Sequence, residues 1–242
     1  MMRNGSSDPK SALKMSEAPP KLAKLLHISA FLTYAYTIYY SHTKVNVPLP
    51  YPEFAYAGKA KYLTQWNLYL SGLYFGLCVL QNLLRSKSLA RVRDYIFCSV
   101  SLPSSIFVTI LFWGIYAVDR ELIFPKEIEP YYPNWVNHCS HTLIAFTAIS
   151  EALLYSHGIP SNRKALPGIL AWFGFYLVWV LYLGVSRGIW VYQVMRVLEP
   201  AGLTAFFLGC TVAVLSLHLT CHALLRVRDS LLSPQAKQQK VG

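Results

Sequence analysis

The stretch WVNHCSHTLIAFTAISEALLY, residues Trp135 to Tyr155, is a long apolar run with two histidines close to its start. A helix of about 20 apolar residues crosses the hydrocarbon core of a bilayer. His138 and His141 are three residues apart, which puts both imidazoles on one face of such a helix. A histidine pair at this spacing often only caps a helix or bonds its neighbours, but in lipid a polar side chain needs a partner. The stretch therefore predicts a membrane-spanning helix whose histidines share a ligand, a proton or a structural partner.

The composition extends this interpretation to the whole chain. Of 242 residues, 54% are hydrophobic and 14% are charged, and the mean hydropathy is +0.35, which is typical of a membrane protein. Apolar stretches long enough to span a bilayer recur along the sequence; they are Leu22 to Tyr40, Leu63 to Leu84, Tyr95 to Val118, Trp135 to Tyr155, Leu166 to Ser186 and Ala201 to Leu225. The sequence predicts an all-α polytopic membrane protein with six transmembrane helices in one bundle.

The basic residues predict the orientation of this bundle. The net charge is +11, but the Lys and Arg residues lie between the apolar stretches, which argues against a nucleic-acid partner. Fifteen of the 22 lie in the N-terminal segment, the second and fourth loops and the C-terminal segment, so both termini are expected in the cytoplasm. We expect a disordered tail over 1–21, a membrane domain over 22–226 and a second cytoplasmic tail over 227–242. The polar start has no signal-peptide pattern. The expected location is the endoplasmic reticulum, another endomembrane or the plasma membrane, with membrane lipids as neighbours.

Several polar residues fall inside the expected spans. Thr64, Asn67 and Ser71 are spaced three and four apart and so form a stripe that should face the interior, because lipid offers it no partner. Glu151 lies about 15 Å further along its helix than His141. It either supports the fold, lies near the inner headgroups or marks a proton or substrate path.

The sequence gives no reason to expect a metal or cofactor. His218, Cys221 and His222 resemble half of a metal site, but no further ligand is evident, so hydrogen bonding in the core is the better interpretation. The five cysteines fall within expected spans without Cys-x-x-Cys spacing, so we interpret them as packing residues. The acid-base-acid triplet Asp119-Arg120-Glu121 is expected to form an ion-pair network at the membrane interface.

Five segments together resemble one family. They are Gly58 to Thr64 (GKAKYLT), Phe75 to Leu80 (FGLCVL), Phe112 to Lys126, Asn137 to Thr142 (NHCSHT) and Gly188 to Tyr192 (GIWVY). In these segments the chain resembles the androgen-induced and androgen-dependent TFPI-regulating membrane proteins, over nearly all of residues 22–226. The resemblance implies hydrolysis of fatty acid esters of hydroxy fatty acids, with Thr64 as the catalytic nucleophile and His141 as the base. The chain departs from the family at Gln193, where proline is usual, and in a longer polar N-terminal segment.

The residues themselves are consistent with this pair. Thr64 and His141 each lie near the start of a span that runs inward on the expected topology, which places them at similar depth. A threonine hydroxyl needs an adjacent base, and a buried neutral imidazole can serve. His138 is a candidate to orient His141 or to line the pocket. The sequence does not specify which groups donate hydrogen bonds to the oxyanion; Asn67 and Asn137 would be guesses.

Two other classes compete with a hydrolase. A membrane di-iron desaturase needs about eight histidines on one side of the membrane. This chain has seven, and the pair His138/His141 is expected at the opposite end from His218/His222. A non-enzymatic transporter or receptor for a lipid would instead use Glu151 and the polar stripes to line a path.

Overall fold

The computed structural model describes residues 20–232, and this part of the chain contains helices and turns without any strand. The predicted all-α class is confirmed. Most of the tails expected over 1–21 and 227–242 lies outside the described residues.

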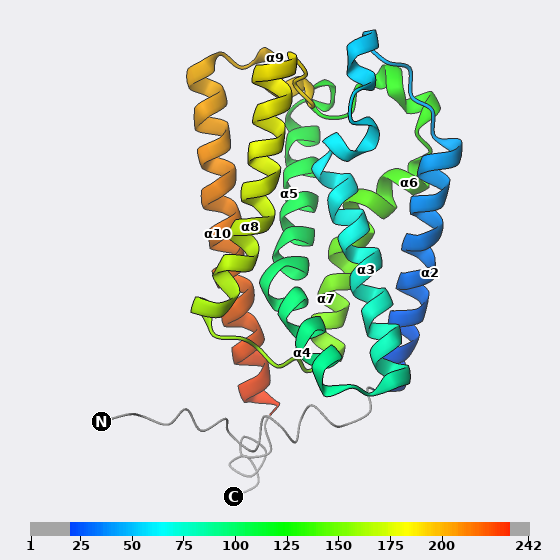
Figure 1. Ribbon diagram of the computed structural model, residues 1–242, viewed down its shortest axis with the longest axis vertical. Coiled ribbons are helices and arrows are strands. Elements are labelled where there is room, and N and C mark those ends of the chain that lie inside the picture. The colour runs from blue at the N-terminus through cyan, green and yellow to red at the C-terminus, as the bar shows by residue number, and fades with distance from the viewer. Residues whose placement is uncertain (1–19, 233–242) are drawn as a thin grey trace, which may run out of the picture.

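The helices run side by side along one direction (Figure 1). The longer segments are α2 (Lys21–Lys44), α3 (Leu63–Leu84), the Lys87–Val118 segment, residues 134–154, the Asn162–Ser186 segment and α10 (Pro200–Leu231). Short elements join them: η1 (Pro52–Ala55), η2 (Gly58–Lys61), η4 (Arg120–Leu122), η5 (Lys126–Tyr131) and α9 (Gln193–Val197). Because the helices alternate in direction, α3 and residues 134–154 begin at the same end of the bundle.

Three of these segments contain wide π turns within otherwise α-helical structure. Lys87–Val118 consists of α4 (Lys87–Ile96), η3 (Phe97–Ser101) and α5 (Leu102–Val118). Residues 134–154 consist of α6 (Asn134–His138), η6 (Cys139–Leu143) and α7 (Ile144–Leu154). The Asn162–Ser186 segment consists of α8 (Asn162–Leu181) and η7 (Tyr182–Ser186). Such turns insert one residue into a helix and are frequent at functional sites.

Three of the segments described are long and apolar enough to cross a membrane, namely Lys87–Val118, Asn162–Ser186 and Pro200–Leu231. The structure therefore supports a membrane protein with apolar helices, and the arrangement of six spans stays a prediction.

Helix boundaries differ from expectation mainly where polar residues continue a helix. The basic loop after α3 is largely helical, because the Ser86 side chain accepts a hydrogen bond from the Leu89 backbone and so caps α4. Pro103 lies in the first turn of α5 directly after η3. The absent N–H of a proline is tolerated in a first turn.

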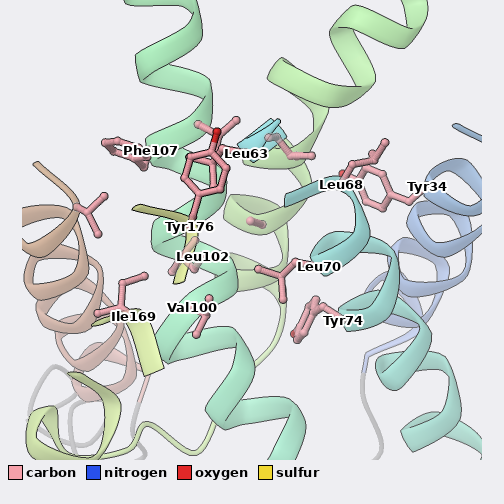
Figure 2. Close-up of a cluster of buried hydrophobic side chains, with 14 of the residues drawn as sticks. Tyr34, Leu63, Leu68, Leu70, Tyr74, Val100, Leu102, Phe107, Ile169 and Tyr176 are labelled. Carbon is pink, nitrogen blue, oxygen red and sulfur yellow. The ribbon is translucent and has the colours of Figure 1, made fainter. Parts of the chain in front are cut away.

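The core combines apolar and polar side chains. Figure 2 shows Leu63, Phe107 and Tyr176 near one another, with Tyr74 at a distance from them. The predicted stripe faces inward as expected, because Asn67 and Ser71 are buried and Thr64 is half-buried. Asn67 is fixed by Ser104, whose hydroxyl donates to its Oδ1 at 2.8 Å. This bond connects α3 to α5.

The segment between α2 and α3 is held by two lysines. Nζ of Lys61 donates to the carbonyls of Phe54 and Gly58, both at 2.8 Å, and lies 4.2 Å from the centroid of the Phe54 ring. Nζ of Lys59 donates to Val45 and Ser41 near the end of α2. Because these bonds fix η2, they also fix the start of α3, where Thr64 lies.

Candidate active site

Thr64 is the second residue of α3 and lies in the wall of an apolar cavity of about 170 Å³. Its side chain is beside the hydroxyl of Tyr192. That hydroxyl accepts a hydrogen bond from the backbone N–H of Leu63 at 3.0 Å. Free N–H groups at the start of a helix need such partners. The same tyrosine therefore caps α3 and contacts the predicted nucleophile.

The cavity lies between α3, α5, α8, α9 and α10, and nearly all of its wall is hydrocarbon. The side chains that line it include Phe107, Leu111, Phe112, Ile169, Phe173, Leu177, Met195, Phe207 and Val214. Thr64, Tyr176, Tyr192, Cys210 and Thr211 are the residues of this wall that carry side-chain hydroxyl or thiol groups. An apolar cavity of about 150 Å³ accepts a benzene-sized ligand. The cavity therefore suits a hydrocarbon group that lies next to a few hydroxyl and thiol side chains.

His141 lies in the π turn η6 and is almost fully buried. Its Nδ1 is 3.0 Å from the carbonyl oxygen of Asn137, which can only accept a hydrogen bond. The proton is therefore assigned to Nδ1, and Nε2 of the neutral ring keeps its lone pair. One face of the ring stacks on Phe112, with 3.6 Å between the centroids and 14° between the planes.

Both predicted residues lie at or next to the cavity wall. Phe112 lines the same cavity as Thr64 and stacks on the ring of His141, and α3 packs against η6. Within residues 20–232, no hydrogen bond joins Thr64 to His141. α3, which contains Thr64 near its start, and residues 134–154, which contain His141, begin at the same end of the bundle.

His138 takes a different place from His141. Its ring is exposed, its Nδ1 lies 3.2 Å from the Thr142 hydroxyl, and it stacks on Trp113 at 5.5 Å. The carbonyl of Asn137, not His138, orients His141. Asn67 is already bonded to serines of α5, and that leaves its amide poorly placed to serve as an oxyanion donor.

Sequence reasoning missed the tyrosines of the cavity. The hydroxyl of Tyr176 donates to the backbone carbonyl of Lys61 at 3.1 Å, and Tyr192 lies next to it. Burial raises the pKa of Tyr192, so this hydroxyl keeps its proton as a hydrogen-bond donor. The motif GIWVY, which ends at Tyr192, was the available signal, but it gave no indication of which helix the tyrosine would meet.

Glu151 lies further along the same helical segment in a buried cluster. Its Oε2 is 2.9 Å from Nε2 of His27, and its Oε1 accepts a hydrogen bond from Tyr74 at 2.9 Å. Nε2 of His157 lies 3.3 Å from Oε1. Glu151 therefore faces the interior of the bundle.

The structure also shows the surroundings of the other polar groups noted in the sequence. Nε2 of His222 donates to the Cys98 carbonyl at 3.0 Å, which fits the expected core hydrogen bonding. Arg120 pairs with Glu129 at 3.0 Å and lies 4.0 Å from Glu121, whereas Asp119 accepts a hydrogen bond from the backbone N–H of Glu121, so the triplet forms only part of the expected ion-pair network. All five cysteines are free thiols, and three of them are buried.

Comparisons with known proteins agree with the resemblance in sequence. The family model described as FAR-17a/AIG1-like protein matches residues 22–226. The androgen-induced gene 1 protein of Homo sapiens is 29% identical over 90% of this chain and 96% of its own length. The androgen-dependent TFPI-regulating proteins of Mesocricetus auratus and Homo sapiens are 35% and 30% identical; the alignments cover 69% and 81% of this chain, and 75% and 88% of theirs. No solved structure matches the chain. Since the family model spans most of the sequence, the chain belongs to the FAR-17a/AIG1-like protein family.

Proposed function

We propose that this protein is a membrane-bound lipid ester hydrolase in which Thr64 is the nucleophile and His141 the general base. The observation that carries the proposal is the apolar cavity with Thr64 in its wall and His141 stacked behind Phe112 of the same wall. A largely hydrocarbon cavity with the Thr64 hydroxyl in its wall suits the part of an acyl chain next to a reactive carbonyl. The proposed substrates are fatty acid esters of hydroxy fatty acids, the class implied by the family resemblance.

The reaction would proceed in two steps. The Thr64 hydroxyl attacks the ester carbonyl while its proton passes to Nε2 of His141, and the departing alcohol takes that proton as the C–O bond breaks. Water then attacks the acyl-threonine and gives its proton to Nε2, which returns it to Thr64 as the fatty acid leaves. Nδ1–H stays bonded to the Asn137 carbonyl throughout, and this bond keeps Nε2 in the unprotonated form at the start. Closure on substrate has to bring Nε2 to the threonine hydroxyl, because catalytic hydrogen bonds often form only in the complex.

Tyr192 is the proposed positioning residue. Its protonated hydroxyl lies beside Thr64 and is held by the Leu63 N–H. From this place it orients the threonine hydroxyl or donates to the oxygen that becomes negative in the transition state. Removal of one oxyanion donor in other hydrolases slows turnover by about 10²–10³-fold.

The experiment measures fatty acid release from a branched lipid ester by membranes that carry each variant at matched expression. A fluorophosphonate probe reports the nucleophile in parallel. Thr64→Ala is expected to abolish both signals. Thr204→Ala is the matched control, because its hydroxyl bonds the Pro200 carbonyl in α10, away from the cavity. Normal turnover in well-expressed Thr64→Ala would reject the mechanism.

The second candidate is a lipid transporter or receptor without catalysis. The nearly unbroken hydrocarbon wall of the cavity favours it, since such a wall binds a lipid whether or not the lipid is cleaved. The same experiment separates the two functions. A transporter would bind the ester, release no fatty acid and take no label from the probe.

A further inference from the structure

A second cluster of reactive side chains lies toward the other end of the bundle and has no part in the proposed hydrolysis. It consists of His27 on α2, Cys78 on α3 and Glu151 on α7, and none of the three is accessible to solvent. One ligand atom from each lies within 4.8 Å of the other two. An imidazole, a thiol and a carboxylate are the side chains that bind zinc in proteins.

The distances within this cluster are close to those of a zinc site. Zn–N, Zn–O and Zn–S bonds of about 2.0–2.3 Å place neighbouring ligand atoms of a tetrahedron roughly 3.3–3.7 Å apart. Nε2 of His27 is 2.9 Å from Oε2 of Glu151, slightly closer than an ion between them requires. The overall spread of 4.8 Å is about one ångström too wide, a difference that rotation of side chains closes.

The surrounding groups orient the Glu151 carboxylate. Tyr74 donates to Oε1 of Glu151 at 2.9 Å, and Nε2 of His157 lies 3.3 Å from the same oxygen. These contacts leave Oε2 directed at His27. Carboxylate ligands of metals are usually held through their second oxygen in this way.

Asn82 provides an independent indication. Its Nδ2 lies 2.9 Å from Nδ1 of His27, while its Oδ1 is buried without a hydrogen-bond partner. The two ends of an amide have nearly the same shape, so their assignment follows from the bonding around them. A half-turn of this amide pairs Oδ1 with an N–H on Nδ1 of His27. Nε2 then has a free lone pair directed at Glu151, and metal-bound histidines commonly have such an acceptor on their other nitrogen.

The charge of the cluster also fits a dication. Among the described residues, Glu151 is contacted by His27, Tyr74 and His157, and the nearby Arg93 is paired with Asp94 at 2.6 Å. A buried carboxylate without a cation is costly in a membrane. Zinc bound by one thiolate, one carboxylate and one neutral imidazole has no net charge, and its binding releases a single proton, from Cys78.

We propose that His27, Cys78 and Glu151 bind a zinc ion that ties α2 to α3 and α7. The site is distinct from the candidate active site, because Glu151 follows His141 by ten residues, or about 15 Å along a helix. It therefore stands whether or not the protein is a hydrolase.

The test is the metal content of the full chain purified in detergent, measured by mass spectrometry. We expect about one zinc per chain in the wild type and less than a tenth of that in Cys78→Ser and in His27→Gln. Cys98→Ser is the matched control, since Cys98 is equally buried but lies outside the cluster, and it should keep its zinc.

X-ray absorption at the zinc edge keeps the proposal testable if the variants fail to fold. In the wild type it should record one sulfur neighbour at about 2.3 Å, with nitrogen and oxygen at about 2.0 Å. A wild-type protein with less than about half a zinc per chain, a zinc shell without sulfur, or full zinc content in Cys78→Ser would each overturn the proposal.

Discussion

The imidazole of His141 lies flat against the ring of Phe112, with 3.6 Å between their centroids. Phe112 also lines the apolar cavity that contains Thr64. One aromatic ring thus separates the predicted base from the space where a substrate would lie. The orientation of His141 depends on this ring on one side and on the Asn137 carbonyl on the other.

Replacement of Phe112 should therefore impair turnover more than a substitution that only changes the volume of the cavity. Phe112→Ala removes the surface on which His141 rests, and misplacement of a catalytic group by about 1 Å can cost roughly a hundredfold in rate. Phe107→Ala enlarges the same cavity without contact to His141 and is expected to be milder. The comparison is fatty acid release at matched expression. Equal losses in both variants would argue against a positioning role for Phe112.

His138 and His141 are expected to differ in importance although they share a motif. His141 is buried beside the cavity wall, whereas His138 is exposed and bonds Thr142. His138→Ala should keep most of the hydrolysis, and His141→Ala should lose nearly all of it. Rates from membranes with each variant would decide this. A greater loss in His138→Ala would reverse the assignment of the base.

Glu151→Gln is expected to destabilise the protein. A glutamine amide has only one oxygen, so it cannot replace both carboxylate oxygens, which now contact His27 and Tyr74. A buried polar group left without its hydrogen-bond partner costs about 1–3 kcal/mol. The melting temperature and the yield should fall more than turnover per folded molecule. Thermal unfolding in detergent and a rate normalised to folded protein would test this. A stable but inactive variant would instead place Glu151 in the chemistry.

Much of the fold could be predicted from hydrophobicity, but the polar contacts could not. The apolar run Leu63 to Leu84 coincides with α3 because polar residues flank the run on both sides. Glu151 was recognised as a buried acid, yet its partners His27 and Tyr74 lie on helices distant in sequence, and no local spacing connects them. The inward orientation of Thr64 followed from a helical repeat. The position of its neighbour Tyr192 depends on how the loop before α10 folds back, and the sequence pattern does not specify this.

Lys61 should give the protein a distinct pH dependence. Burial lowers the pKa of Lys61 from 10.5 to about 8. Between these values the unfolded chain binds a proton that the folded protein has lost, so the contribution of Lys61 to stability rises with pH across this window. The melting temperature of the wild type relative to Lys61→Met should therefore increase from about pH 8 to about pH 10. Lys126→Met, which changes an exposed lysine of η5, is the control. A difference that stays constant or shrinks would contradict this prediction.

The last prediction concerns Thr64 and His141 as a unit. If the imidazole acts only by taking the threonine proton, loss of either residue removes the same step. Thr64→Ala and His141→Ala should then each abolish most turnover, and the double variant should cost little more than either alone, because residues that act together are strongly non-additive. Thr64→Ser should keep partial activity, since it retains the hydroxyl but loses the methyl group that restricts the side-chain rotamer. Fatty acid release and probe labelling from the four variants give the complete cycle. Independent, multiplying losses would mean that His141 acts on the substrate by another route, and probe labelling that persists in Thr64→Ala would place the nucleophile elsewhere in the cavity.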